Sequence, residues 1–512
     1  MGEKLQKMLA EKSRIEQGGG PEKIQKQHES GKLTARERIA LLFDEGSFEE
    51  SGLFVKHRCH NFGMEKVDVP SEAVVTGFGR IEGRGVFAFA HDFTVMGGAS
   101  GEMQAKKIVR IQEAALDARV PIIGLNDSGG ARIQEGVFSG YGEVFYQNVQ
   151  ASGVIPQISA VMGPCAGGAT YSPALTDFTI AVDKVSRMFV TGPEVVRAVI
   201  GEEVTAESLG GAMTHNAISG VAHLLAVDDY DCINQLKQLL SYLPDNCYEK
   251  QAPIPCQDDP QRRDEELNDL IPEEYQKTYD IKRIIITVVD DHKFFETQPY
   301  HAMNLVTGFA RMNGQAVGIV ASQPRHLAGC LDINASVKGA RFIRTCNAYN
   351  IPLISIVDVP GYLPGTDQEH GGIIRHGAKM LFAWAEATVP KIVVVVGKVY
   401  GGSVNAMCSR ELRADLVLAW PTANRAVMGA EGAVNIIFRK EILAAEDPGA
   451  KRAELANWYR NEFLTPYTAA GNGRFDEVIE PALTRKKIIA GLTIMKNKQV
   501  HRIPRRNGNI PL

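Results

Sequence analysis

Short apolar runs alternate with amphipathic stretches along most of the chain from about residue 68 onward. The elements expected in the first half are paired strands over residues 73–78 and 85–90, a helix over 102–118, a strand over 120–126, a helix over 142–151 and a strand over 154–162. Short apolar runs bounded by turn residues are typical of buried strands. Strands that alternate with helices imply βαβ crossovers, so the pattern predicts an α/β fold.

The first 45 residues are highly charged and follow a different pattern. Leu5, Met8 and Leu9 are spaced as the apolar face of one helix. A second short helix is predicted after Thr34, because Thr34 can act as N-cap with Glu37 in the capping-box position. Such a segment is expected to pack on a partner or to close the edge of a domain.

The order of elements occurs twice. Val120–Asp127 aligns without gaps on Ile351–Asp358, 231 residues later, and Pro156 falls on Pro390 at a spacing of 234 residues. A period this long is not that of a solenoid. The sequence therefore predicts two tandem domains of one fold, related by internal duplication. We place the N-terminal domain at residues 1–250, a Pro- and Asp-rich linker at 251–274 and the C-terminal domain at 275–512.

Composition narrows the classes of function. The 512 residues carry a net charge of −4, whereas general nucleic-acid affinity normally needs a basic surface. The eight cysteines include no pair with zinc-ribbon spacing, and no His, Cys, Asp and Glu cluster has metal-ligand spacing, so no metal is expected. The N-terminus has no signal-peptide core and no apolar stretch is long enough to span a bilayer, so the cytoplasm is the expected location.

A Gly-Gly turn follows an apolar run in each half. Gly163–Ala169 follows residues 154–162, and Gly401–Ser403 follows residues 389–400. Successive backbone N–H groups at such a turn can bind developing negative charge on an oxygen, and glycine permits close approach. A tight strand–helix crossing without a ligand is the alternative. Two copies in register favour a ligand site and suggest a reaction with two enolate-like species.

Side chains suited to acid–base work are less evident. Asp127 and Asp358 end corresponding strands, where each could act as a base or cap the following turn. Arg132 could bind an anion or pair with a nearby carboxylate. The scattered histidines are interpreted as structural. Neither a Gly-x-Ser-x-Gly elbow nor a phosphate-binding loop is present in the sequence.

Motifs in both halves match those of a known family. The motifs of the first half are DSGGARIQE at 127–135, GPCAGGA at 163–169, YSPALTD at 171–177, FVTGP at 189–193 and EVTAE at 203–207. Those of the second half are CLDINA at 330–335, DVPG at 358–361, GGIIRHGAK at 371–379, YGGS at 400–403, AWP at 419–421 and MGAEG at 428–432. From about residue 18 to its C-terminus, the chain resembles the biotin-dependent acyl-CoA carboxyltransferases. This family includes propionyl-CoA carboxylase β subunits, methylmalonyl-CoA decarboxylase α subunits and the carboxyltransferase subunit of transcarboxylase.

The resemblance implies two crotonase-like domains and a homohexamer, a trimer of dimers, with each active site between the N-domain of one subunit and the C-domain of another. The implied reaction moves a carboxyl group between biotin and the α-carbon of a short acyl-CoA, propionyl-CoA or (S)-methylmalonyl-CoA. Biotin would be carried covalently by a partner, which is either a biotin carboxyl carrier protein or a biotin carboxylase/carrier α subunit. With membrane decarboxylase subunits instead, the same chemistry would run as the first step of a sodium pump.

The resemblance also assigns residues, all of them through the motifs above. The backbone amides of Gly167 and Gly168 would hold one enolate oxygen, and those of Gly402 and Ser403 the other; which pair serves biotin and which the thioester stays open. The residues assigned to the CoA-binding side are Gly129, Gly130 and Ala131, and those assigned to the biotin side are Gly361, Gly371 and Gly372.

The chain departs from the family pattern in two places: after the second glycine turn, and in the loop at 136–142, which is about two residues shorter than usual and is expected to alter the pocket entrance. Val404 and Asn405 follow the second glycine turn, where family members often have Tyr and then Asp or Leu. The second of these positions faces the acyl pocket in the family, so Asn405 is expected to influence the choice of acyl group.

Two other classes of function are weighed against this one. A crotonase-type hydratase or CoA hydrolase usually needs a single such domain and a carboxylate acid–base pair beside the oxyanion site. A non-catalytic scaffold in a larger biotin complex would not depend on the glycine turns.

Overall fold

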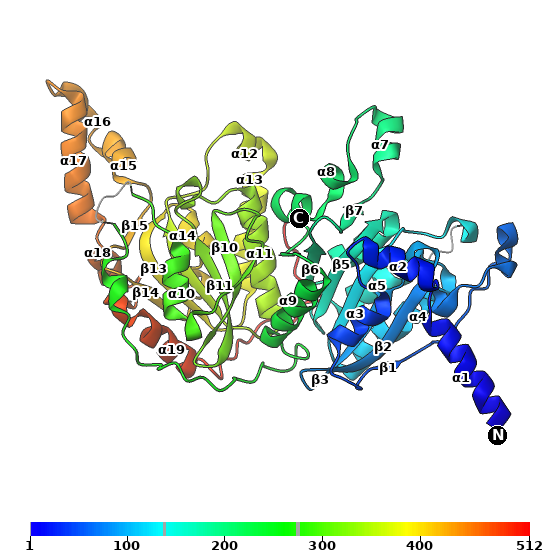
Figure 1. The fold of residues 1–512 in the computed structure, drawn as a ribbon. Coiled ribbons are helices and arrows are strands. Elements are labelled where there is room, and N and C mark those ends of the chain that lie inside the picture. The colour runs from blue at the N-terminus through cyan, green and yellow to red at the C-terminus, as the bar shows by residue number, and fades with distance from the viewer. Residues whose placement is uncertain (1, 137–139, 273–276) are drawn as a thin grey trace. The chain divides into compact units, whose positions relative to one another are not determined.

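The computed structural model describes residues 2–136, 140–272 and 277–512. The chain divides into two compact units, Met1–Lys250 and Gln251–Leu512. Each unit is one mixed sheet with helices packed against it (Figure 1).

The first unit contains a sheet in the order β1-β2-β3-β4-β5-β6-β8, with β7 paired to β5. Its strands are β1 (Glu49–Glu50), β2 (Val74–Ile81), β3 (Arg84–His91), β4 (Ile122–Ser128), β5 (Gln157–Ala166), β6 (Phe178–Val182), β7 (Arg187–Phe189) and β8 (Leu224–Ala226). β2 and β3 form the predicted antiparallel pair. The strands from β3 to β8 run parallel, as βαβ crossovers require.

The helices of this unit follow the sequence pattern closely. They are α1 (Gly2–Glu16), α2 (Pro21–Glu29), α3 (Ala35–Leu42), α4 (Glu102–Ala118), α5 (Tyr141–Ala151), α6 (Tyr171–Leu175), α7 (Pro193–Ile200), α8 (Ala206–Gly210) and α9 (Asp229–Tyr242). The capping box predicted at α3 is present: the Thr34 side chain accepts from Glu37 N–H, and the Glu37 side chain accepts from Thr34 N–H. Leu5 and Leu9 of α1 are exposed.

The second unit repeats this topology. Its sheet order is β9-β10-β11-β12-β13-β14-β16, with β15 paired to β13. The strands are β9 (Phe295–Thr297), β10 (Leu305–Met312), β11 (Gln315–Ser322), β12 (Leu353–Val359), β13 (Lys391–Tyr400), β14 (Leu416–Ala419), β15 (Asn424–Ala426) and β16 (Glu477–Val478). Strand for strand, this is the order of the first sheet, including the short extra strand beside the fifth one. The predicted internal duplication is confirmed.

The second unit adds a helical extension to the shared fold. Its helices are α10 (Ile281–Val288), α11 (Ile333–Ala348), α12 (Thr366–Gly371), α13 (Ile373–Glu386), α14 (Ser403–Ala406), α15 (Ala430–Ile437), α16 (Arg439–Ala444), α17 (Pro448–Phe463), α18 (Pro466–Gly471) and α19 (Thr484–Ile494). In Figure 1, α15, α16 and α17 stand off the sheet of this unit. They pack on one another through their own apolar cluster, which includes Val434, Ile442 and Leu455.

One sequence-based boundary differs from the structure. β5 does not end at Met162 but continues to Ala166, because residues 164–166 pair with β7. The 251–274 segment is not free of contacts: Leu267, in the 3₁₀ turn η7 (Glu265–Asp269), is buried in the core of the second unit. Residues 137–139 of the loop at 136–142, and residues 273 and 274, lie outside the described residues. Within the described ranges, no helix has the length and apolarity that crossing a bilayer demands.

A buried lysine occupies the same place in both units. Lys107 of α4 donates from Nζ to Ser71 O (2.8 Å), Ser71 Oγ (2.7 Å) and Val74 O (2.6 Å). Lys338 of α11 lies 231 residues later and donates to carbonyls of the chain that enters β10, including Leu305 O (2.7 Å). Burial lowers the pKa of both lysines to about 7. Each lysine therefore ties its own helix, α4 or α11, to the segment that enters the antiparallel strand pair β2–β3 or β10–β11.

A buried ion network ties the N-terminal segment to the first sheet. Arg38 of α3 donates to Asp127 (2.9 Å), to Asp229 (2.8 Å) and to Met162 O (2.7 Å). The Arg38 side chain is fully buried. Removing one partner from such a network leaves uncompensated buried charge, which is strongly destabilising.

We predict that Arg38→Met destabilises the first unit by about 3–5 kcal/mol, since Asp127 and Asp229 lose a shared cation. Arg36→Met is the matched control on the same helix: Arg36 pairs with Glu50 at a partly exposed site (2.7 Å) and should lose less than ~1 kcal/mol. Urea titration followed by circular dichroism measures both. Equal shifts of the two midpoints would contradict the assignment.

Candidate functional site

The glycine turn of the first unit lies where β5 ends. Gly167 begins the 3₁₀ turn η5 (Gly167–Thr170) with a φ of 61°, a conformation that favours glycine. A Cβ on Gly168 would meet the ring of Tyr141 at 2.5 Å. Glycine is thus required at 168 for packing as well as for close approach. The first N–H groups of such a turn have no carbonyl partner within it.

The second unit has the same turn after β13. Gly401, with a φ of 59°, donates its N–H to Ala426 O (3.0 Å). The next two N–H groups, of Gly402 and Ser403, stand at the start of α14, where an intrahelical acceptor is lacking. Ser403 Oγ is buried and donates to Tyr400 O (2.6 Å). Its hydroxyl therefore closes the turn, and its backbone N–H is the group left for a ligand.

The strand-end aspartates are both buried and both engaged. Asp127 accepts from Lys32 Nζ (3.0 Å) and from Arg38 (2.9 Å). Asp358 accepts from the Tyr279 hydroxyl (2.9 Å) and from Lys398 N–H (2.8 Å). Neither carboxylate caps the turn that follows it, so that interpretation is corrected: each reaches sideways to residues outside its own turn. A general base needs a reachable proton, and these carboxylates are committed to structural partners.

Of the two roles expected for Arg132, anion binding and pairing with a carboxylate, the structure shows the second. Its guanidinium donates to Glu72 (2.9 Å) and to Glu135 (2.6 Å), and its side chain is fully buried. Burial favours the neutral form, but the two carboxylates outweigh it and raise the pKa of Arg132. The group holds the loop after β4 in place.

That loop carries the residues assigned to the CoA side. Gly130, with a φ of 103°, leaves only 2.9 Å between a hypothetical Cβ and Ala166 O. Gly129 donates to Gly97 O (2.9 Å), and Gly130 to Ser128 Oγ (3.2 Å). Ala131 forms a bridge with Ser100. The loop thus lies directly against the end of β5, where its shape rather than its engaged N–H groups can line a site.

The residues assigned to the biotin side lie on two segments of the second unit. Gly361 corresponds to Gly130, and a Cβ there would meet nothing within 4 Å. Gly371 ends α12, and Gly372, with a φ of 92°, links it to α13. Asn405 lies in α14, two residues after Ser403, and its Oδ1 accepts from Ser409 Oγ (2.7 Å). The roles assigned to these residues stay predictions.

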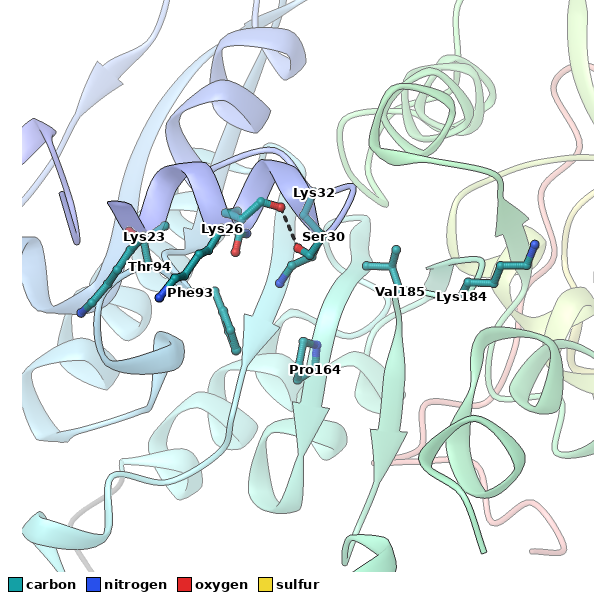
Figure 2. A pocket seen from close by; sticks show the side chains of 10 residues that line it. Lys23, Lys26, Ser30, Lys32, Phe93, Thr94, Pro164, Lys184 and Val185 are labelled. Atoms are coloured by element: carbon teal, nitrogen blue, oxygen red, sulfur yellow. Dashed lines mark hydrogen bonds between the residues drawn. The ribbon is translucent and has the colours of Figure 1, made fainter. Parts of the chain in front are cut away.

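Sequence patterns gave no sign of a cationic pocket in the first unit. The pocket has a volume of about 460 Å³. As Figure 2 shows, Lys23 and Lys26 line it from α2 and Pro164 from β5, while Lys184, in the turn after β6, borders it with a side chain that points away from the other two lysines. Among the residues that the structure describes, none of these three lysines has a carboxylate partner within 4.0 Å. Residues this far apart in sequence line one pocket only after folding.

The wall of the pocket is continuous with the strand-end network. Lys32 Nζ lies 4.1 Å from the centre of the Phe93 ring and is bound to Asp127. Phe93 follows β3, Pro164 precedes the glycine turn by three residues, and Lys184 follows β6. The pocket is therefore at the carboxyl ends of parallel strands, where open α/β sheets bind ligands. Its charge and aromatic wall suit a ligand with phosphate groups.

The arrangement offers backbone donors and a cationic pocket, while the candidate side-chain bases are engaged. Within the described residues, no group of three or more His, Cys, Asp or Glu could hold a metal ion. All eight cysteines are free thiols. Such a site can stabilise negative charge that develops on an oxygen during a reaction.

Comparisons with known proteins give a consistent result. Residues 26–510 match the model of the carboxyl transferase domain. The chain is 56% identical over 512 residues to the methylmalonyl-CoA decarboxylase subunit alpha of Veillonella parvula, covering 100% of this chain and 99% of that one. It is 54% identical over 502 residues to the mitochondrial propionyl-CoA carboxylase beta chain of Homo sapiens, covering 97% and 91%.

A solved structure extends the likeness to three dimensions. Transcarboxylase 12S, a hexamer crystallised with methylmalonyl-coenzyme A and methylmalonic acid, superimposes with a TM-score of 0.97 at 53% identity, covering 100% of this chain and 98% of that one. The fold class expected from the sequence, two tandem crotonase-like domains, is confirmed.

The two glycine turns are predicted to differ in their tolerance of a methyl group. Gly168→Ala should cost roughly 1–3 kcal/mol, because the new Cβ overlaps the Tyr141 ring. Gly402→Ala should leave stability nearly unchanged, since the nearest atom to its Cβ, on Tyr362, lies at 3.7 Å. Thermal unfolding of both variants measures this difference. A Gly402→Ala midpoint as low as that of Gly168→Ala would contradict the geometry.

Proposed function

The chain belongs to the carboxyl transferase family, and we propose that it moves a carboxyl group between biotin on a carrier protein and the α-carbon of propionyl-CoA or methylmalonyl-CoA. The observation that carries this proposal is the pair of duplicated glycine turns in a chain that matches transcarboxylase 12S over its whole length. A reaction that passes through two oxyanions needs two such sets of donors.

The proposed role of the turns is to hold those two oxygens. Gly402 and Ser403 would supply one pair of N–H donors and Gly167 and Gly168 the other, with either pair able to receive the thioester. Preorganised donors of this kind stabilise charge that appears only in the transition state. Biotin, when delivered by its carrier, supplies or accepts the carboxyl group. Gly401 and Gly402 are exposed, so the second turn is open to a ligand.

The partners set the direction of the reaction. With an ATP-driven biotin carboxylase partner, the chain would carboxylate propionyl-CoA. With the membrane subunits of a sodium pump it would decarboxylate methylmalonyl-CoA, and the 56% identity to a decarboxylase α subunit favours keeping this second candidate. We further propose a homohexamer like that of transcarboxylase 12S, with the biotin carrier as a separate partner. Asn405 is proposed to influence the choice of acyl group.

We also propose that the N-terminal unit binds the CoA moiety, with its phosphates in the cationic pocket. Lys23 and Lys26, which have no carboxylate partner within 4.0 Å among the described residues, line a space of about 460 Å³ at the carboxyl ends of β3 and β5. A crotonase-type hydratase is less well supported, because Asp127 and Asp358 are both committed to structural contacts.

Exchange of carboxyl between free N-carboxybiotin and a propionyl-CoA/methylmalonyl-CoA pair tests the reaction. We expect exchange with the unmodified chain, and exchange within roughly threefold of it for Ser403→Ala, because the lost hydroxyl contributes only a turn-closing hydrogen bond. Ala169 stands at the corresponding position of the first turn, so an alanine fits there. Absence of exchange in the unmodified chain would refute the proposed function. A loss of several hundredfold in Ser403→Ala would show that the hydroxyl itself reacts.

Phosphate binding in the pocket is tested by removing lysine charges and comparing the kinetics with two substrates, one with and one without the nucleotide. Lys23→Ala and Lys26→Ala together should raise KM for propionyl-CoA about tenfold, with kcat unchanged, because remote binding contacts are lost uniformly. With S-propionyl-pantetheine, which lacks the nucleotide, the variant and the unmodified chain should be equal. Lys66→Ala, which is not among the residues that line the pocket, is the control. Equal losses on both substrates would argue against phosphate binding at this site.

A further inference from the structure

The strand before each glycine turn shifts register at the same place. In the second unit Val357 pairs with Val395, but Val359 pairs with Val399, so β13 contains two more residues than β12 across this interval. In the first unit Asn126 pairs with Val161 and Ser128 with Cys165. The residue skipped on the shorter strand is the buried aspartate in both cases. Such a shift interrupts the ladder and leaves backbone groups to be paired by other means.

In the second unit the aspartate side chain accepts one of the strand N–H groups that the register shift leaves unpaired. Asp358 Oδ1 accepts the N–H of Lys398 at 2.8 Å, on the segment of β13 that is out of register. Its other oxygen accepts the Tyr279 hydroxyl at 2.9 Å. A Cβ on Gly397 would lie 2.5 Å from the carboxyl carbon of Asp358. The carboxylate is thus enclosed against the strand three residues before Gly401.

The first unit has no such donor at the corresponding place. Lys398 corresponds to Pro164, 234 residues earlier, and proline has no N–H to be accepted. Asp127 instead binds Lys32 and Arg38, and Arg38 also donates to Met162 O in the shifted segment. The fourth residue of α10, which corresponds to Arg38 in α3, is the buried Ile284. Among the described residues, no cation therefore binds Asp358 as Arg38 binds Asp127. The Tyr279 hydroxyl, next to the N-cap of α10, binds Asp358 where Lys32 binds Asp127.

We propose that Asp358 and Tyr279 are positioning residues for the second turn: through Lys398 N–H they fix the end of β13 so that the N–H groups of Gly402 and Ser403 point at the reacting oxygen. This inference rests on the proposed carboxyl transfer. Oxyanion donors act only within about 0.5 Å of their productive position, and a shift of about 1 Å at a reacting centre can cost roughly 10²-fold in rate. Only Val399 and Tyr400 separate Lys398 from Gly401, so a released strand end moves the turn directly.

The test compares Asp358→Ala with Asp358→Asn. Asparagine keeps an oxygen that accepts Lys398 N–H, and its amide can donate to the Tyr279 oxygen, so Asp358→Asn should retain kcat within about fivefold. Asp358→Ala removes the acceptor and should lower kcat roughly 10–100-fold with KM for propionyl-CoA unchanged, because the donors matter in the transition state. Rates are normalised to folded hexamer measured by circular dichroism and gel filtration. A purely structural role predicts less folded protein with unchanged kcat, which would overturn the proposal.

A double-variant cycle keeps the test decisive if Asp358→Ala folds poorly. Lys398→Pro deletes the N–H that Asp358 accepts, as Pro164 does naturally, and costs no ladder bond because that N–H is already given to a side chain. The kcat of Asp358→Asn and of Tyr279→Phe is then measured with and without Lys398→Pro. The proposal predicts that Tyr279→Phe lowers kcat several-fold alone but has no further effect with Lys398→Pro. Additive effects would overturn it. Failure of the unmodified chain to transfer carboxyl would instead refute the proposed function.

Discussion

A buried carboxylate at the end of the fourth strand of each sheet is the constraint on which the site depends. Asp127 and Asp358 each lie against a glycine of the next strand, and a Cβ on Gly163 would come within 1.9 Å of Asp127 Oδ1. A charge in this position must be paired or hydrogen-bonded. The need to satisfy it determines what packs beneath the sheet, how the next strand ends, and so where the glycine turn begins.

The two halves meet this need in different ways, although their strands have the same order. The first unit uses cations from its N-terminal segment, and it therefore requires α3 and the residues just before it to fold onto the sheet. The second uses a tyrosine hydroxyl and a backbone N–H. Duplication preserved the turn and its backbone donors. The side chains that support the turn diverged, because any group able to satisfy the carboxylate serves the purpose.

Much of the fold followed from sequence patterning. The α4 helix has the bounds that its apolar spacing predicted, and the capping box at Thr34 forms as expected, because local hydrogen bonds and periodicity decide such features. The end of β5 was missed by four residues. Its last part pairs with β7, a strand distant in sequence, and long-range pairing has no local signature. The sequence likewise left Arg132 with two possible roles. The structure decides between them, because it places Glu72, 60 residues away in sequence, beside the guanidinium.

The sequence by itself determined that two α/β domains of one kind occur in tandem, that each contains a glycine turn, and which family the motifs resemble. Those features depend on spacing along the chain. Only the tertiary structure decided how the turns are supported and where the cationic pocket lies. Lys23, Phe93 and Pro164 come from three separate segments that line one pocket, and the partners of Asp358 come from 79 and 40 residues away. The physical reason is that burial and charge pairing depend on distance in space, which the order of residues does not specify.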